Sequence, residues 1–180
     1  LTPVADEMPF VRRDGSTIWT RRTMSAACDA AGDPRYVISV VEDITERKRA
    51  EEALRASEQL LSATFSQAGV GIFVTSLESG YMEVNDKYCA MLGYTRDELV
   101  RMSISDVNLP QDMDDVLANR ARMLSGEWPH STRERQVRRK DGTLVWVGHS
   151  TTLVHDESGK PHHFITVAED ISDRKRAEER

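Results

Sequence analysis

The chain has 180 residues, of which 39% are hydrophobic and 30% are charged, and its formal net charge at pH 7 is −6. This composition is typical of a globular protein with room for one ordinary domain and extra segments, or for two small domains. The basic residues lie in short mixed runs and form no stripe interleaved with aromatic residues, which argues against nucleic acid as a partner.

No apolar run approaches the roughly 18 residues of a membrane helix, and no signal peptide is visible. We therefore expect a cytoplasmic location. Because the chain starts at Leu1, directly in strand-like sequence, we also expect a piece of a longer parent protein, whose own membrane anchoring stays open. Cys28 and Cys89 share no C-x-x-C spacing and predict two reduced thiols rather than a zinc or redox motif.

An internal repeat organises the chain. Residues 10–52 match residues 137–179 at a constant offset of 127, with about 18 of 43 positions identical. A repeat of that length is a small domain plus a linker rather than a solenoid unit. Residues 1–45 hold only the last three strands of this domain, whereas residues 69–172 hold a complete copy. Three strands alone would expose apolar surface unless another chain or a dimer covers them, and the sequence leaves both open.

Residues 46–68 predict a helical linker, with Thr45 as its N-cap. The segment contains no proline or glycine, and good helix formers dominate it. Apolar or small residues recur at spacings of four and three, the pattern of a parallel dimeric coiled coil; the alternative is a single amphipathic helix on its own domain. The expected dimer seam consists of Ala50, Leu54, Ser57, Leu61, Thr64 and Ala68.

The complete copy predicts an α+β domain with a five-stranded antiparallel sheet and helices on one face. We expect strands at 70–75 and 81–84, helices at 86–92, 95–100, 103–107 and from 110 until Gly126, and strands at 132–139, 143–155 and 162–169. Asn85 is the expected N-cap of the first of these helices, and Gly93 its end. Thr95 and Glu98 form a capping box, and Pro110 stands where the long helix begins.

Three segments of the complete copy resemble the PAS domain family. The segment 85–99 resembles the helical signature of the family. The hairpin at 140–146 and the ending at 170–172 resemble its C-terminal half and exit motif, with Ser172 in place of the usual threonine. The resemblance covers about residues 57–173 completely and residues 10–45 as a truncated copy. It implies a bacterial sensor module that binds a small molecule, a cofactor or only a partner chain, with residues 173–180 as the start of an exit linker helix.

Catalytic motifs are missing from the sequence. We find no nucleophile elbow, P-loop, Rossmann glycine pattern, phosphoacceptor segment or G-G-D-E-F string, so we expect no enzyme activity in this chain. The cofactor stays unknown. Flavin photosensors of the family carry a reactive cysteine in a different motif from that around Cys89, and the haem-binding members carry a histidine on the long helix, where residues 111–125 have none. Both groups are therefore disfavoured.

A ligand pocket in the core is the remaining candidate site, with a solid core as the alternative. Its expected wall consists of Ile72, Val74, Val84, Tyr88, Met91, Leu92, Ile104, Met113, Val116, Leu117, Trp146, Leu153 and Phe164. His149, His155 and His162 lie close together in the predicted hairpin, which would suit a transition metal. We favour exposed polar residues instead and predict no metal site, because the equivalent positions of the first copy are Arg22, Cys28 and Arg35.

The junction between the last strand and the exit helix indicates a signal relay. Asp170 ends a strand and Ser172 starts a helix, an arrangement that caps the helix and fixes its angle to the strand. A plain N-cap without a signalling role would use the same contacts. We expect Arg138 or Arg139 to pair with Asp170. The complete set of expected relay residues is Asp43, Ile44, Thr45, Arg138, Arg139, Asp170, Ile171 and Ser172.

Two functions follow from this organisation. The first is a homodimeric sensor and relay module that senses a small ligand or the state of a partner. It would report to a downstream histidine kinase or cyclic-dinucleotide enzyme outside this chain. The second is a ligand-free module that dimerises and spaces its neighbours. Binding of a small molecule in the core separates the two.

Overall fold

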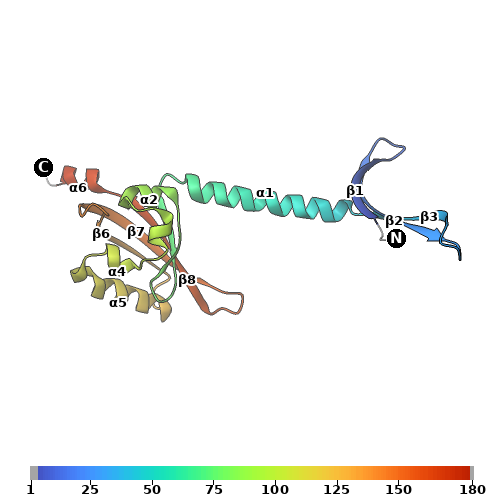
Figure 1. Ribbon diagram of the computed structural model, residues 1–180. Coiled ribbons are helices and arrows are strands. Elements are labelled where there is room, and N and C mark those ends of the chain that lie inside the picture. The colour runs from blue at the N-terminus through green and yellow to red at the C-terminus, as the bar shows by residue number, and fades with distance from the viewer. Residues whose placement is uncertain (1–3, 179–180) are drawn as a thin grey trace. The chain divides into compact units, whose positions relative to one another are not determined.

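The computed structural model describes residues 4–178 and divides into two compact units, residues 1–61 and 62–180. Helix α1 (Thr45–Gln67) begins in the first unit and ends in the second (Figure 1). Across residues 4–178, no helix is both long enough and apolar enough to span a membrane.

The first unit contains a three-stranded antiparallel sheet in the order β1 (Val4–Val11), β2 (Thr17–Cys28) and β3 (Pro34–Asp43). Every residue of β3 is exposed, and Tyr36, Val37 and Val40 are each more than half exposed. The expectation that three strands alone expose apolar surface is therefore confirmed for this unit taken by itself.

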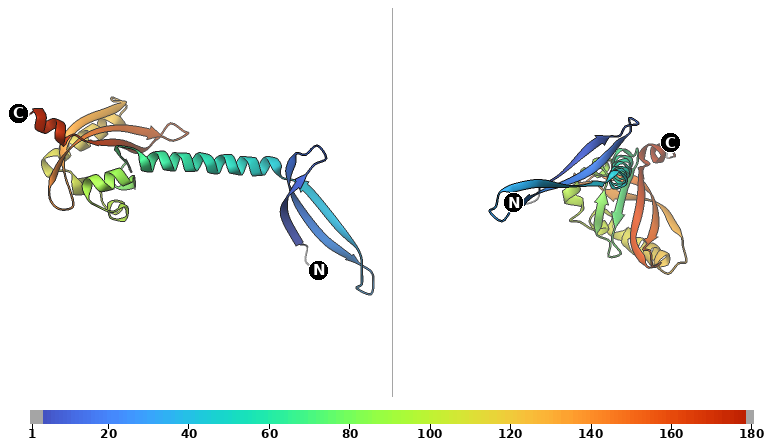
Figure 2. Two further views of the ribbon diagram at one scale, coloured as in Figure 1. Left: turned by 90° about the horizontal axis from the view of Figure 1, so that it is seen from above. Right: turned by 90° about the vertical axis from the view of Figure 1, so that its right-hand side faces the viewer.

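The second unit is built on a five-stranded antiparallel sheet in the order β5-β4-β8-β7-β6. Figure 1 labels β6, β7 and β8 of this sheet, and Figure 2 shows the unit from two further sides. Its strands are β4 (Gly71–Thr75), β5 (Tyr81–Val84), β6 (His130–Arg138), β7 (Leu144–His155) and β8 (Pro161–Asp170). The first hairpin of the unit, β4–β5, joins the sheet through β8, so strands far apart in sequence become neighbours. The predicted α+β class with a five-stranded antiparallel sheet is confirmed.

Between β5 and β6 the chain forms a series of short helices on one face of the sheet. They are α2 (Asp86–Leu92), α3 (Arg96–Leu99), α4 (Ile104–Val107), a 3₁₀ turn (Pro110–Asp112) and α5 (Met113–Leu124). The caps predicted for α2 are present: Asn85 Oδ1 accepts a hydrogen bond from the Tyr88 N–H, and Gly93 ends α2 with φ of 79°. Thr45, predicted as the N-cap of the linker helix, is instead the first residue of α1, and its Oγ1 accepts from the Trp19 N–H. The exit helix α6 (Ser172–Glu178) follows β8.

Asn85 ties the end of the linker helix to this domain. Its Oδ1 accepts hydrogen bonds from the N–H groups of Ile72 and Tyr88, both at 2.9 Å. Its Nδ2 donates to the carbonyl oxygens of Phe65 and Val70, both at 3.0 Å. Because the side chain is fully buried, all four bonds are needed to offset its loss of water.

The main core lies between the sheet and the helices. It is a cluster of aromatic and aliphatic side chains: Phe73, Tyr81, Val84, Tyr88, Met91, Leu92, Leu99, Ile104, Val107, Val116, Val137, Val145, Val147 and Ala168. A smaller cluster of Met123, Leu153 and Phe164 packs near the far end of α5, with Leu77 and Trp128 against it. The space between these two clusters holds the cavity.

Candidate functional site

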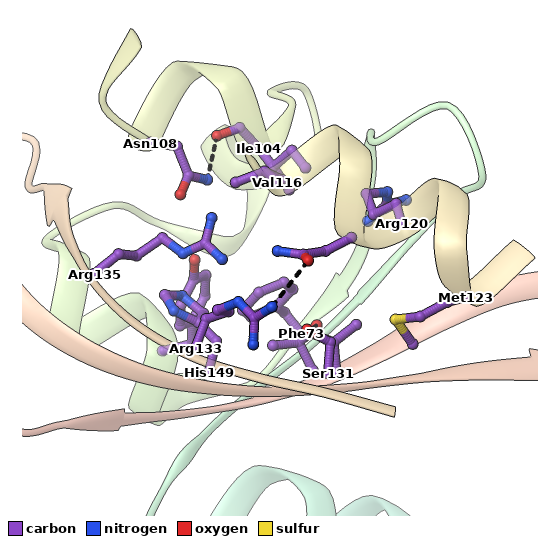
Figure 3. A pocket seen from close by; sticks show the side chains of 14 residues that line it. Phe73, Ile104, Asn108, Val116, Arg120, Met123, Ser131, Arg133, Arg135 and His149 are labelled. Atoms are coloured by element: carbon purple, nitrogen blue, oxygen red, sulfur yellow. Dashed lines mark hydrogen bonds between the residues drawn. The ribbon is translucent and has the colours of Figure 1, made fainter. Parts of the chain in front are cut away.

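A cavity of about 60 Å³ lies between the sheet and helices α4 and α5 of the second unit. One part of its wall is apolar and the other is polar. It is lined by Phe73, Tyr88, Ile104, Asn108, Val116, Asn119, Arg120, Met123, Ser131, Arg133, Arg135, His149, Thr151 and Thr166. Figure 3 shows Arg133, Arg135 and His149 on the sheet side, facing Asn108, Ile104 and Val116 on the helical side.

Strand β6 supplies two arginines to the cavity. Ser131 and Val137 are buried on the inner face of β6, and the period of two places Arg133 and Arg135 on that same face. The Arg133 Nη2 donates to Asn119 Oδ1 at 3.2 Å. Only 13% of the Arg135 side chain is exposed, and this burial lowers the pKa of Arg135.

Helix α5 supplies the third arginine, Arg120. Its Nη1 donates to Thr75 Oγ1 at 3.1 Å, and its Nη2 donates to the Ser76 carbonyl oxygen at 2.5 Å. The guanidinium lies 3.9 Å from the centre of the Phe164 ring, a cation–π contact. Burial lowers the pKa of Arg120 to about 10, so the group stays charged at neutral pH while bonded to uncharged oxygens.

Two enclosed polar atoms of the wall have no hydrogen-bond partner among the described residues: His149 Nδ1 and Asn108 Oδ1. The Asn108 amide is oriented by its Nδ2, which donates to the Ile104 carbonyl oxygen at 2.7 Å. Burial, together with the charge of Arg135, lowers the pKa of His149 to about 3. The imidazole is therefore neutral at pH 7.

The structure brings only part of the expected pocket wall to the cavity. Tyr88, Ile104 and Val116 line it. Val84, Met91 and Leu92 lie in the solid main core with Met113 packed against it, and Leu153 and Phe164 lie in the smaller cluster. The remaining four expected wall residues, Ile72, Val74, Leu117 and Trp146, do not line the cavity either.

The register of two strands explains part of this difference. On β4, Gly71, Phe73 and Thr75 are buried, so Ile72 and Val74 between them are directed to the opposite face. On β7, the neighbours of Trp146 on both sides are buried, which directs the Trp146 ring away from the core. Leu117, on α5, is 50% exposed.

The histidines do not assemble. Across residues 4–178, no group of three potential metal-ligating side chains of the His, Cys, Asp and Glu types is present. His155 is exposed, and His162 contacts its neighbour His163 through their Nδ1 atoms at 2.6 Å. The interpretation of His149 as an exposed polar residue is wrong, because the inner face of β7 carries this side chain into the cavity wall.

The junction between β8 and α6 brings together several of the residues that the sequence singles out. Asp170 Oδ1 accepts a hydrogen bond from the Ser172 N–H at 2.9 Å, and Arg139 pairs with Asp170 Oδ2 at 3.4 Å. Ser172 Oγ in turn accepts a bond from the Trp146 N–H at 3.2 Å. The junction therefore joins the start of the exit helix to both β7 and β8. Of the two candidate arginines, Arg139 is the partner of Asp170, whereas Arg138 is exposed on the outer face of β6.

The first unit contains the same junction at positions 127 residues earlier. Asp43 Oδ1 accepts from the Thr45 N–H at 3.0 Å, and Arg12 pairs with Asp43 Oδ2 at 3.1 Å. Thr45 Oγ1 accepts from the Trp19 N–H at 3.0 Å. In each unit the isoleucine between the aspartate and the hydroxyl residue, Ile44 or Ile171, is buried.

A second set of contacts ties α6 to β6, and the sequence comparison missed it. Glu134 forms ion pairs with Lys175 at 2.8 Å and with Arg174 at 2.7 Å, and both contacts lower the pKa of Glu134. The Lys175 Nζ also lies 5.2 Å from the centre of the Trp146 ring. In the first unit, Glu7 holds the equivalent residues Arg47 and Lys48 at 2.6 and 2.7 Å. Glu7 and Glu134 lie just outside the repeat as compared from sequence, although the offset of 127 also relates them.

The expected dimer seam lies on α1, which has no buried residue in this structure. Leu54 and Leu61 are 62% and 68% exposed. Ala68 follows the last helical residue, Gln67. The helix therefore presents an uncovered face along most of the expected seam.

Comparisons with known proteins agree with this fold. A family model described as "PAS fold" matches residues 81–168, and a second, described as "PAS domain", matches residues 2–46. The PAS domain of an HTR-like protein from Haloarcula marismortui has a similar structure. Its TM-score is 0.57 at 28% identity, over 69% of this chain and 99% of that one.

Two curated relatives are signalling proteins. The probable diguanylate cyclase DgcE of Escherichia coli K12 is 28% identical over 134 residues, which are 74% of this chain and 12% of that protein. The sensor histidine kinase TmoS of Ectopseudomonas mendocina is 25% identical over 127 residues, 71% of this chain and 13% of that protein. The chain thus spans only a small part of the length of either relative.

Proposed function

The chain belongs to the PAS family, and it is similar to parts of a diguanylate cyclase and of a sensor histidine kinase. We propose that its second unit binds a signal molecule in the cavity and passes the signal to an output domain through α6. The output domain lies outside this chain. A histidine kinase or a diguanylate cyclase is the proposed class, because the two relatives described above carry those names.

The observation that carries this proposal is the repeated junction. In both units the same four kinds of contact connect the last strand to the helix that follows: the aspartate cap, the arginine pair, the hydroxyl–tryptophan bond and the glutamate clasp. A helix that needed only an N-cap would be served by the aspartate alone. The additional contacts fix the helix to three strands at once, as a relay requires.

A path from the cavity to α6 runs along two strands. On β7, His149 lines the cavity, and Trp146, three residues earlier, contacts Ser172. On β6, Arg133 and Arg135 line the cavity, and Glu134 between them holds the exit helix from the opposite face. A shift of either strand on ligand binding therefore changes how α6 packs against the sheet.

A ligand-free dimerisation and spacing module is the second candidate function. The exposed leucines of α1 favour it, because a parallel coiled coil would cover them without any ligand. The two functions are compatible in one parent protein, since a coiled coil is also a means by which a rotation of a linker helix reaches an output domain.

The test of the relay is Asp170→Ala in the full-length parent protein. The variant loses the helix cap and the Arg139 pair, and we expect output activity to lose its response to the signal while the domain stays folded by circular dichroism. Glu169→Ala, at the exposed neighbouring position of β8, is the matched control and is expected to respond normally. A folded Asp170→Ala protein with a wild-type response would refute the relay.

A further inference from the structure

We propose that the cavity of the second unit binds a small organic carboxylate that also carries a hydroxyl group. The inference rests on the proposed sensory function and names the chemical class of the ligand. Three features of the wall carry it: an excess of positive charge, two polar atoms without partners and an apolar side.

The wall contains positive groups without matching negative ones. Arg120, Arg133 and Arg135 line the cavity, and no Asp or Glu is among the described lining residues. The nearest carboxylate ion pairs are long, from Asp115 to Arg133 at 3.8 Å and to Arg135 at 3.9 Å, and the Asp115 side chain is 59% exposed. Arg120 and Arg135 are largely buried, whereas Arg133 is partly exposed. Buried cations with so little compensation are costly, and an anion in the cavity would offset that cost.

The two copies of the repeat show what is missing. In the first unit, Asp6 and Arg22 are cross-strand neighbours and form an ion pair at 2.7 Å. The equivalent neighbours in the second unit are Arg133 and His149. In the first copy the two side chains therefore neutralise each other. In the second copy two nitrogen-bearing side chains occupy these positions and line a cavity. A ligand carboxylate takes the chemical place of the Asp6 side chain.

The unpartnered atoms specify the rest of the ligand. Asn108 Oδ1 is an acceptor without a donor among the described residues, and the bond from the Asn108 amide nitrogen to a backbone carbonyl fixes its orientation. A ligand hydroxyl supplies that donor. A carboxylate accepts from the guanidinium groups of Arg133 and Arg135, the pairing for which the planar arginine fork is suited, and from His149 Nδ1 when that atom carries the imidazole proton.

The apolar side of the wall and the size of the cavity narrow the class further. Phe73, Ile104, Val116 and Met123 offer contacts to a hydrocarbon fragment, which inorganic phosphate or sulfate lacks. A volume of about 60 Å³ is room for roughly four or five water-sized groups. A hydroxy acid of lactate size has the required carboxylate, hydroxyl and short aliphatic part.

The test is calorimetric titration of the 180-residue chain with four probes, namely lactate and three compounds that each lack at least one of its features. DL-lactate carries all three features, propionate lacks the hydroxyl, propylene glycol lacks the carboxylate, and inorganic phosphate is an anion that lacks both the carboxylate and the aliphatic part. We expect lactate to bind, propionate to bind at least about tenfold more weakly, and the other two not to bind. Equal binding of lactate and phosphate, or no heat from any of the four probes, would overturn the inference.

Two substitutions locate the site. Arg135→Gln is expected to weaken lactate binding at least about tenfold, and Arg133→Gln, which changes a less buried group, provides the same test if the first variant does not fold. Arg138→Gln, on the outer face of the same strand, is the control and should bind as wild type. Lactate binding that both cavity variants retain would show that the ligand lies elsewhere.

The experiments distinguish failure of the ligand assignment from failure of the proposed sensory function. Loss of lactate binding in Arg135→Gln, combined with output from the full-length protein that ignores lactate, would support the cavity assignment and remove the sensory role. Loss of the output response in folded Asp170→Ala, combined with no binding of any probe to the wild-type chain, would leave the relay in place and overturn the ligand class.

Discussion

We predict that the unfolding free energy of the chain depends on pH through His149, a residue of the cavity wall. Its imidazole is enclosed, lies opposite Arg133 on the neighbouring strand, and has the charge of Arg135 close to it. These surroundings lower the pKa of His149 from 6.5 to about 3 in the folded chain. The Phe73 ring, 6.3 Å away between centres, adds apolar contact and no compensating charge.

The direction of the pH dependence follows from the number of protons that His149 binds in the folded and in the unfolded chain. Between the unfolded value of 6.5 and the folded value of about 3, the unfolded chain carries a proton on this imidazole and the folded chain does not. Stability contributed by the neutral His149 is therefore fully present above the unfolded pKa and is lost as the pH falls. The slope is about 1.4 kcal/mol per pH unit, so lowering the pH from about 6 to about 4.5 costs about 2 kcal/mol of unfolding free energy through this residue alone.

His149→Gln removes this titration without adding a charge. We expect the variant to lose about 2 kcal/mol less than wild type over that interval, as measured by urea unfolding at the two pH values and followed through NMR amide signals of β4 to β8. His155→Gln, at the exposed end of the same strand, is the control and should keep the wild-type difference. Carboxylates such as Glu134 titrate in all three proteins and cancel in the comparison.

A direct measurement checks the premise. In a ¹⁵N NMR titration of the histidine rings, the signals that disappear in His149→Gln should not change between about pH 7 and about pH 4.5 in wild type. Titration of those signals near the ordinary value of 6.5 would refute the burial argument. Lactate bound beside His149 should raise its pKa, because a carboxylate favours the charged imidazole.

Three further variants test the domain framework and the linker helix. Asn85→Ala removes four hydrogen bonds from a buried position and should cost at least about 3 kcal/mol of unfolding free energy in chemical denaturation; a loss under about 1 kcal/mol would contradict its tying role. Gly71→Ala would place a Cβ 3.1 Å from a carbonyl oxygen of β8 and should lower stability by about 1–3 kcal/mol in the same assay, whereas a neutral result would mean that the strand can move. The double change Leu54→Lys and Leu61→Lys should shift the chain toward monomer in analytical ultracentrifugation, and Ala53→Lys, off the seam, should not; a dimer that survives the double change does not use this seam.

Much of the fold could be predicted from sequence because its signals are local. The N-cap at Asn85, the glycine end at Gly93 and the capping box at Thr95 each specify a helix boundary within a few residues, and the structure has all three. The exit junction could also be predicted, since the repeat displays it twice. Strand pairing beyond hairpins is not local, and nothing in the residues of β4 states that its second neighbour is β8.

The cavity was harder to predict for a physical reason. The sequence predicts an apolar wall that includes Ile72 and Val74, whereas in the structure both residues face away from the core. The polar wall residues Arg133, Arg135 and His149 resemble ordinary surface positions in a sequence. The alternation Ser131, Arg133, Arg135, Val137 was the available signal, because Val137 marks the inner face and the period of two carries that face back to the arginines.

Strand β6 connects the two halves of the proposed mechanism. Its inner face places Arg133 and Arg135 at the cavity, and its outer face places Glu134 against Arg174 and Lys175 of the exit helix. These outer ion pairs are exposed to solvent, so each contributes little to stability and their geometry can change at small cost. A ligand needs only a differential affinity of a few kcal/mol to shift such a junction.

The repeat separates the input from the relay. Glu7 holds the linker helix in the first unit as Glu134 holds α6 in the second. The inward positions differ, because Asp6 and Arg22 neutralise each other where Arg133 and His149 cannot. We infer that both copies transmit a strand movement to the following helix through the same junction contacts. We also infer that the charges on the inner strand faces decide whether a copy binds a ligand: Asp6 and Arg22 neutralise each other, whereas Arg133 and His149 leave room for an anion.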